Sequence, residues 1–159
     1  MPAVVVAPLD IADPAVAEAV VGIQRRSYAV EAALIGFDGI PPLRETVSEL
    51  QSSGRCGLSV LGARMGGELA GLLGYRWVDL LGGELDIDRL AIDPRFFRLG
   101  LASALLAALP AAAAVIVSTG TRNQPALALY RRQGFRSTGS REIAPGVTVT
   151  ELRLTAPLG

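Results

Sequence analysis

The 159-residue sequence predicts a mixed α/β fold, in which a sheet of about seven strands is flanked by four helices. Three observations predict it. Seven short segments are apolar or alternate between apolar and polar residues, as strands do, and four longer segments repeat apolar residues at helical spacing. Glycine pairs or a Pro-Gly turn separate several neighbouring strands. The predicted order is β-α-α-β-β-β-α-β-α-β-β.

The composition indicates a globular protein, because 50% of the residues are hydrophobic and 19% are charged. The length fits one domain over residues 1–159. The formal net charge is zero, so we expect no basic surface that attracts nucleic acid. We expect no membrane contact either, since no apolar run is long enough to cross a bilayer and the N-terminus lacks a signal-peptide pattern.

The cysteine and histidine content limits the chemistry. Cys56 is the one cysteine, which excludes an internal disulfide and fits a cytoplasmic protein. The lack of histidine removes the most common general base, the serine-type triad and most zinc sites, so we expect no metal site. With no histidine to activate it, Cys56 is a poor candidate nucleophile.

The first part of the chain predicts a strand over residues 3–8 and then two helices. Asp13-Pro14 offers an N-cap followed by a first-turn proline. A loop punctuated by glycine and proline spans residues 36–42, and the second helix ends near Gly54. Apolar residues mark the buried faces of the helices: Val16, Val20, Ile23 and Tyr28 in the first, and Leu43, Val47 and Leu50 in the second.

The middle of the chain predicts an antiparallel meander of three strands, residues 58–65, 68–81 and 84–92. Glycine pairs at 66–67 and 82–83 mark the two turns between them. The rest of the chain alternates between helix and strand. We expect a helix over 101–109, a strand over 113–118, a helix over 125–133 closed by Gly134, and two strands over 135–143 and 147–154 joined at Pro145-Gly146.

The most informative segment is residues 90–102, where a strand breaks at Pro94 and a tight loop opens directly into a helix. Such a junction directs several unpaired backbone N–H groups, and the positive end of the helix dipole, at one point. That point suits a phosphorylated ligand.

A second segment, residues 123–135, follows one strand later, and the two together resemble the signature segments of the GNAT superfamily, the acyl-CoA-dependent N-acyltransferases. The phosphate loop of that family has the pattern Gln/Arg-x-x-Gly-x-Gly/Ala. The positions that correspond here are Phe97, Arg98, Leu99, Gly100, Leu101 and Ala102, followed by Asn123, Ala126, Tyr130, Gly134 and Phe135 in the second segment. The resemblance implies a mostly antiparallel sheet whose central parallel pair, residues 84–92 and 113–118, splays apart.

The resemblance also implies acetyl-CoA as the co-substrate. Backbone N–H groups of residues 97–102 would hold its pyrophosphate, with Arg98 as an added cation, although Phe97 departs from the expected Gln or Arg. Pantetheine would fill the gap between the splayed strands and pair with backbone groups near Leu90 and Ile92. An N–H near Ile92 would polarise the thioester carbonyl.

The second segment supplies side chains. Ala126 and Tyr130 share one helix face, so the small Ala126 leaves room for the cofactor. In relatives this tyrosine protonates the departing CoA thiolate, and Asn123 lines the cofactor site. The alternative interpretations are a core aromatic residue at Tyr130 and a plain helix cap at Asn123.

The acceptor amine needs a base, because an alkyl amine with a pKa near ~10 is mostly ammonium at neutral pH. Asp86 and Asp88 are the candidates, and strand alternation predicts that both lie on the face of Leu90 and Ile92. The alternative is that both are solvent-facing strand charges, paired with Arg89 or Arg76.

Three further carboxylates, Glu31, Asp38 and Glu45, lie in or beside the loop between the first two helices, which walls the acceptor site in relatives. They could recognise a cationic substrate, but we interpret them as solvated surface charges. The resemblance thus implies direct attack of an amine on acetyl-CoA in a ternary complex. The acceptor, and the choice between acetyl and longer acyl groups, stay open.

Two other function classes stay open. A CoA-binding sensor or regulatory module would keep the fold without turnover. A nucleotide-binding α/β domain is disfavoured, because the loop lacks a Gly-Lys-Ser/Thr ending and follows an antiparallel meander. A homodimer would be ordinary for the resembled family.

Overall fold

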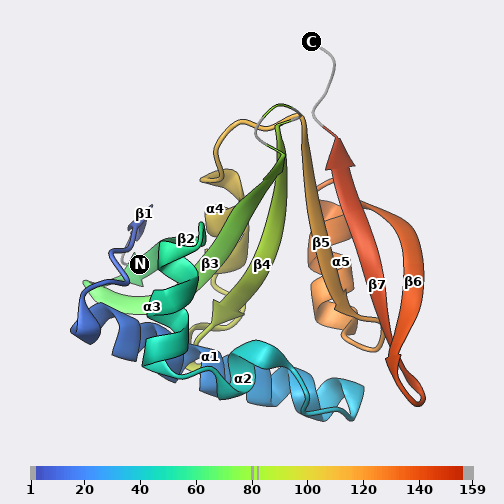
Figure 1. Cartoon of the computed structure of the whole chain (residues 1–159), viewed down its shortest axis with the longest axis horizontal. Helices are drawn as coiled ribbons and strands as arrows, with labels where there is room; N and C mark the ends of the chain where they lie inside the picture. The colour runs from blue at the N-terminus through green and yellow to red at the C-terminus, as the bar shows by residue number, and fades with distance from the viewer. Residues whose placement is uncertain (1–2, 80, 82, 156–159) are drawn as a thin grey trace.

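The computed structural model describes residues 3–79, 81 and 83–155 (Figure 1). The strands are β1 (Val4–Pro8), β2 (Ser59–Met65), β3 (Glu68–Asp79), β4 (Glu84–Ile92), β5 (Ala114–Gly120), β6 (Arg136–Ala144) and β7 (Val147–Thr155). The helices are α1 (Pro14–Ile35), α2 (Pro41–Arg44), α3 (Val47–Arg55), α4 (Leu101–Ala107) and α5 (Gln124–Arg132), with a single 3-10 turn at Pro94–Phe96.

All seven strands form one sheet in the order β1-β2-β3-β4-β5-β7-β6. Neighbouring strands run antiparallel except for β4 and β5, which are parallel. The predicted α/β class, the mostly antiparallel sheet and the central parallel pair are therefore confirmed.

Glycine turns set the register of the meander, as predicted. Gly66 and Gly67 have φ of +59° and +82°, and Met65 pairs directly with Glu68 across them. These left-handed conformations are what a two-residue hairpin turn of the primed type requires. In the next turn Gly83 has φ +70°, whereas the predicted turn residue Gly82 lies outside the described residues.

The helical region after β1 differs from the prediction at one point. The side chain of Asp13 accepts a hydrogen bond from the N–H of Ala15 and caps α1, as expected. The expected second helix is divided, because α2 begins inside the predicted 36–42 loop and Thr46 starts a new helix. The Thr46 hydroxyl accepts from the backbone N–H of Glu49. The described residues thus form five α-helices rather than four.

The helices cover the sheet on both faces (Figure 1). α4 and α5 pack on one face, over a core that includes Leu73, Leu85, Leu105, Val117 and Leu127. α1 and α3 pack on the other, over a second core that includes Ile23, Leu50, Val60, Leu72 and Ala91. Among the described residues, no helix combines the length and the apolar character needed to cross a membrane.

The parallel pair splays in its second half. β4 and β5 pair from Glu84 opposite Ala114 to Ile87 opposite Val117. Beyond these residues the strands diverge, and α1 crosses the open end of the gap (Figure 1). Because backbone groups along the gap have no neighbouring strand to pair with, the splay creates a site where an extended ligand can hydrogen-bond.

Candidate active site

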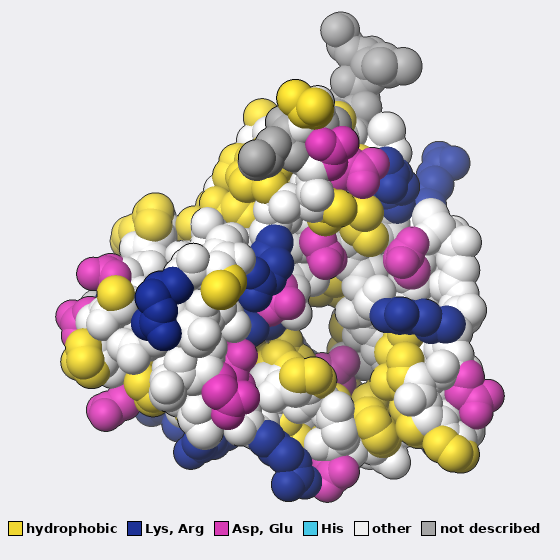
Figure 2. Space-filling view, viewed as in Figure 1, with side chains coloured by type: hydrophobic (Ala, Val, Ile, Leu, Met, Phe, Trp, Pro, Cys, Tyr) yellow, Lys and Arg dark blue, Asp and Glu magenta, His cyan; other side chains and the backbone are white. Residues whose placement is uncertain are grey.

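The gap between β4 and β5 holds a cavity of about 400 Å³. In the space-filling view it is an opening in the middle of the molecule, between the part built on β1–β4 and the part built on β5–β7 (Figure 2). It is lined by residues from α1, the α1–α2 connection, β4, the loop before α4, β5 and α5, including Tyr28, Glu31, Ile40, Asp88, Leu90, Ile92, Phe97, Ala102, Thr119, Asn123, Ala126 and Tyr130.

A β-bulge in β4 changes which side chains face this cavity. Ile87 lies opposite Tyr75 and Arg89 lies opposite Gly74, so Asp88 is an extra residue without a partner on β3. Alternation reverses at a bulge. Ile87 therefore packs in the same core as Leu90 and Ile92, although the sequence spacing is odd.

The predicted placement of Asp86 is wrong for this reason. Asp86 lies on the sheet face opposite Leu90 and Ile92, where it is paired in register with Arg76 of β3. Burial and the nearby carboxylates of Asp88 and Glu151 raise the pKa of Asp86. Asp88 lines the cavity, but Asp86 is not among the lining residues.

The backbone of β4 presents N–H groups to the gap, as predicted. The Leu90 N–H donates to the hydroxyl of Tyr28 on α1 at 3.0 Å. The Asp93 N–H points the other way and donates to Ala70 of β3. Since N–H directions alternate along a strand, the Ile92 N–H points into the gap with that of Leu90. Tyr28 thus already occupies one of the two donors.

Tyr130 is both a core aromatic residue and a residue of the cavity wall. It is buried in the core and meets Phe135 edge to face at 5.3 Å between ring centroids. It also lines the cavity. Burial, with smaller contributions from Tyr28 and Glu31, raises the pKa of Tyr130 well above the ordinary tyrosine value. The hydroxyl therefore stays protonated at neutral pH, as a proton donor must be.

Asn123 is both a helix cap and a cavity residue. Its Oδ1 accepts from the backbone N–H of Ala126 at 3.2 Å, which starts α5. Ala126 lines the cavity one turn before Tyr130, as the helical spacing predicts.

The predicted phosphate loop turns sharply through two left-handed residues. Arg98 has φ +63° and Gly100 has φ +81°, with Leu99 between them. A Cβ at Gly100 would meet nothing within 4 Å, so the loop surface is open there. Gly100 begins α4 without a cap from any described side chain. Alternating conformations of this kind turn successive backbone N–H groups toward one concave point.

The side chains of this loop divide into three groups. Phe97 and Ala102 line the cavity. Leu99 is exposed, whereas Leu101 is fully buried in the core, so only its backbone is available to a ligand. Arg98 makes no ion pair within the described residues, which leaves its guanidinium available to an anion.

Asp93 anchors the base of the loop. Its side chain is almost fully buried and accepts hydrogen bonds from Arg26 of α1 at 2.9 Å and from Arg95 at 3.1 Å. Burial alone would raise the pKa of Asp93, but the hydrogen bonds from Arg95 and Arg26 lower it to about 2.

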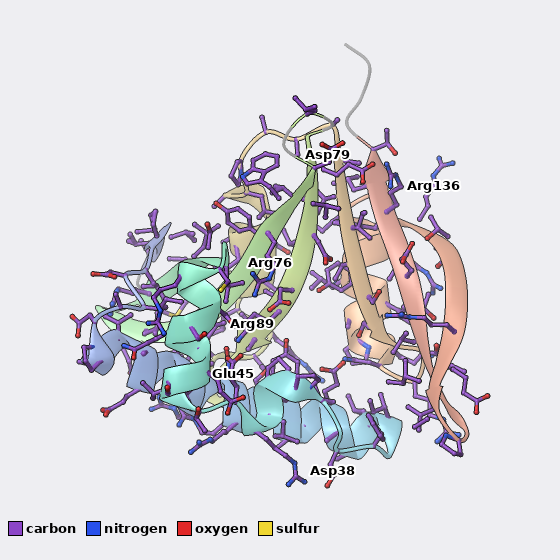
Figure 3. All side chains as sticks on the ribbon, viewed as in Figure 1. Asp38, Glu45, Arg76, Asp79, Arg89 and Arg136 are labelled. Atoms are coloured by element: carbon purple, nitrogen blue, oxygen red, sulfur yellow. The ribbon has the colours of Figure 1, made fainter. Side chains whose placement is uncertain are left out.

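A buried polar cluster lies behind the part of the cavity wall that Asp88 and Arg89 form (Figure 3). Arg89 of β4 and Glu45 of the α2–α3 connection point toward each other and form an ion pair, and both are largely buried. Gln24 of α1 accepts from Arg89 at 3.0 Å and donates to Glu45 at 3.2 Å and to the Pro42 carbonyl at 3.3 Å. Arg89 also donates to Asp88 through Nε at 2.9 Å and Nη2 at 2.7 Å.

The local packing explains how Arg89 reaches this position. Its side chain crosses Gly74 of β3, where an added Cβ would lie 2.8 Å from the Arg89 Cγ. Burial would lower the pKa of Arg89, but its hydrogen bonds and charge pairs with Glu45 and Asp88 outweigh burial and raise it. The guanidinium is therefore a permanent cation in the interior.

The other carboxylates named from the sequence separate clearly. Asp38 is exposed and pairs with Arg44 at 2.8 Å, as a surface charge. Glu45 is buried in the cluster above, and Glu31 lines the cavity, so neither is a solvated surface charge as expected. Cys56 is exposed beyond the end of α3 and is not a lining residue.

Sequence reasoning missed the role of α1 in this site. Tyr28 and Glu31 are three residues apart, which places them on one helix face, and both line the cavity. That spacing was a usable signal. The partners of Arg89 were not visible in the sequence, since Glu45 and Gln24 lie 44 and 65 residues away.

Comparisons with known proteins agree with this geometry. The UPF0157 protein YqkA of Bacillus subtilis is 32% identical over 143 residues, covering 87% of this chain and 40% of YqkA. The mycothiol acetyltransferase of Clavibacter michiganensis is 44% identical over 71 residues, covering 41% of this chain and 23% of that protein. The matched segment thus covers less than half the length of either relative.

Solved structures share the fold. The ribosomal-protein-S18-alanine N-acetyltransferase of Escherichia coli superposes with a TM-score of 0.76 at 20% identity, over 99% of this chain and 96% of that one. The PaiA N-acetyltransferase of Thermoplasma acidophilum, solved in complex with coenzyme A, gives 0.68 at 16% identity, over 94% and 98%. Residues 28–135 match the acetyltransferase (GNAT) family. This range includes the splayed strands, both signature segments and most of the residues that line the cavity. The chain belongs to the acetyltransferase (GNAT) family.

Proposed function

We propose that this protein transfers the acetyl group of acetyl-CoA to a primary amine by direct attack in a ternary complex. The observation that carries the proposal is the cavity between the splayed strands β4 and β5, which joins the 97–102 loop on one side to Tyr130 on the other. An extended thioester that enters along this gap would have its phosphates at the loop and its sulfur beside the tyrosine.

The cofactor side supplies recognition through the backbone. The N–H groups around Arg98 and Gly100 suit a pyrophosphate, and the guanidinium of Arg98 adds a cation. Leu90 and Ile92 offer backbone groups along the gap for the pantetheine amides. An N–H of this strand is suited to the thioester oxygen as negative charge develops on it.

The reaction balances as follows. The neutral amine nitrogen forms a bond to the thioester carbon, and the C–S bond breaks with its electron pair leaving on sulfur. Tyr130 gives its hydroxyl proton to that sulfur and regains one from the newly formed, protonated amide nitrogen. The proton that the ammonium first released passes through a carboxylate to solvent. A thiol with a pKa of ~8.5 needs only modest help to leave, so one hydroxyl suffices.

The acceptor must lose that first proton to a carboxylate. Asp86 and Asp88 stay predictions for this role, with Asp88 favoured by its position at the cavity and disfavoured by its two hydrogen bonds from Arg89. A carboxylate held by a guanidinium is a weakened base, because the arginine stabilises its charged form.

The test is CoA release from acetyl-CoA, followed with a thiol reagent over a panel of alkylamines, amino acids and peptides with free N-termini. Amine-dependent thiol release, with mass spectrometry locating an acetyl group on the amine nitrogen, supports the proposal. Acetyl-CoA binding without release from any amine would instead favour a CoA-binding regulatory module of the same fold. Failure to bind acetyl-CoA would overturn both.

A further inference from the structure

We infer that Glu31 of α1 binds the ammonium group of the acceptor and takes its proton before the attack. This inference rests on the proposed acetyl transfer and names the residue that the transfer still lacks. It also defines the acceptor as an amine that arrives positively charged, with its nitrogen on the α1 side of the cavity.

Glu31 lies at the wall of the cavity. Among the described residues the acidic side chains that line the cavity are Glu31 and Asp88. Glu31 comes from the last turns of α1, which crosses the open end of the gap, and it is half-buried. Its carboxylate accepts a hydrogen bond from the hydroxyl of Thr119 on β5 at 3.3 Å. That contact turns the side chain toward the gap rather than toward solvent.

Glu31 and Asp88 differ in how their charges are paired. Asp88 is held by the guanidinium of Arg89, at 2.7 Å and 2.9 Å. Glu31 has no cation within 4.0 Å among the residues that the structure describes. The carboxylate of Glu31 therefore keeps an uncompensated negative charge at the wall of the cavity, and an ammonium is the partner that such a charge lacks.

Glu31 lines the same cavity as Tyr28 and Tyr130. The negative charge of Glu31 contributes to the raised pKa of Tyr28 and of Tyr130. Tyr28 binds the Leu90 N–H, and Tyr130 is the proposed donor to sulfur. Burial is the largest cause of both shifts, but Glu31, Tyr28 and Tyr130 all line one cavity, so the carboxylate borders the same space as the two hydroxyls.

The step is a simple proton transfer. The acceptor ammonium gives one proton to a carboxylate oxygen of Glu31, which leaves the nitrogen lone pair free to attack and the glutamate as a neutral acid. The Thr119 hydroxyl continues to orient the side chain. After product release, the carboxylic acid returns the proton to solvent, so no other co-reactant is needed.

The experiment compares Glu31→Gln with Glu18→Gln, the same substitution at an exposed site on the same helix. Glutamine keeps the size and the oxygen that accepts from Thr119 but cannot take a proton. Steady-state CoA release is measured at pH 7 with the best alkylamine of the panel and with hydroxylamine, whose nitrogen is largely unprotonated, after subtraction of the enzyme-free rate.

We expect Glu31→Gln to lower kcat/KM for the alkylamine about 100-fold or more, with hydroxylamine and the affinity for acetyl-CoA close to wild type. Glu18→Gln should match wild type in every measurement. Equal losses with both nucleophiles would mean a structural role, and no loss with the alkylamine would mean no role; either result overturns the inference. An inactive wild-type protein would instead overturn the proposed function, which keeps the two failures distinct.

Discussion

Two parts of the cavity wall, the loop at residues 97–102 and the segment at Asp88 and Arg89, differ in how they are built. The loop at residues 97–102 is exposed and is shaped by left-handed residues at 98 and 100. Another part of the wall is formed by Asp88 and Arg89, which belong to a buried polar cluster that includes Glu45. A phosphate shared by every CoA thioester can be recognised by a generic backbone cradle. An acceptor that differs among relatives needs side chains whose positions are fixed by tertiary contacts.

The largest effect that follows from this contrast concerns stability. Removing the guanidinium in Arg89→Met leaves the Glu45 charge buried without a cation, so we expect the free energy of unfolding at pH 7 to fall by about 3–5 kcal/mol. Urea unfolding measures the change. The double variant Arg89→Met/Glu45→Gln should recover part of the loss, since no unpaired charge then remains at position 45.

A loss below about 1 kcal/mol in the single variant would contradict the contrast. It would mean that the buried cluster around Arg89 and Glu45 can adjust as freely as the exposed loop. The double-mutant cycle also separates the contribution of Glu45 from that of Asp88, because Asp88 is partly exposed and can be hydrated when Arg89 is removed.

The second prediction concerns the backbone side. Gly100→Glu places a negative charge at the proposed pyrophosphate position, so we expect the dissociation constant for acetyl-CoA to rise about 100-fold or more in calorimetry. Gly67→Glu is the matched control, because Gly67 also has a left-handed φ, +82° against +81°, and open space around its Cα. Both variants carry similar backbone strain, of about 1–2 kcal/mol.

Tight binding by Gly100→Glu would show that the loop is misassigned. Weakened binding by Gly67→Glu as well would point to a general loss of stability instead. Only a loss confined to position 100 supports backbone recognition of the phosphates.

The same contrast explains what the sequence could predict. The strands and turns around Gly66 and Gly67 follow local signals, as does the strand–loop–helix junction at Gly100, and all of these lie where expected. The capping pattern from Thr46 to Glu49 could also have revealed the division of the second helix.

The features that were predicted wrongly depend on contacts between residues far apart in the sequence. The bulge at Asp88 arises because this residue of β4 has no partner on β3, and no single residue of β4 indicates the bulge in the sequence. The face predicted for Asp86 was therefore wrong, although the strand itself was right. Likewise Glu31 was interpreted as a surface charge, because its distance from β5 depends on how α1 crosses the sheet.

The third prediction tests whether the exposed loop has its own buried anchor. The pKa of Asp93 is lowered from 3.8 to about 2, so its charged form stabilises the fold above about pH 4, and this contribution is lost as the pH falls through 2. Asp93→Asn should lower the free energy of unfolding at pH 7 by about 1–2 kcal/mol, since both arginine partners are half exposed.

The difference between wild type and Asp93→Asn should be constant above about pH 5 and shrink between pH 4 and pH 2. Urea unfolding at several pH values measures it. A difference that does not depend on pH would mean that the asparagine loses packing rather than charge. The variant should bind acetyl-CoA more weakly only if the anchor also fixes the loop.

The smallest effect is expected at Tyr130, which lines the cavity. Tyr130→Phe keeps the edge-to-face contact with Phe135 and removes only the hydroxyl, so we expect kcat to fall about tenfold and the affinity for acetyl-CoA to stay unchanged. Tyr75→Phe is the control, because Tyr75 packs against the same core without lining the cavity.

The modest size of this loss has a chemical reason. A thiolate is a good leaving group near neutral pH, so its protonation contributes less than the removal of the ammonium proton, where the pKa gap to neutral pH is about 1.5 units larger. The loss in Tyr130→Phe should therefore be smaller than the loss in Glu31→Gln. A turnover rate that matches wild type at every pH would remove the acid role from Tyr130 and leave the hydroxyl as a structural group of α5. A reversed order of the two losses would mean that departure of the thiol, and not activation of the amine, limits the rate.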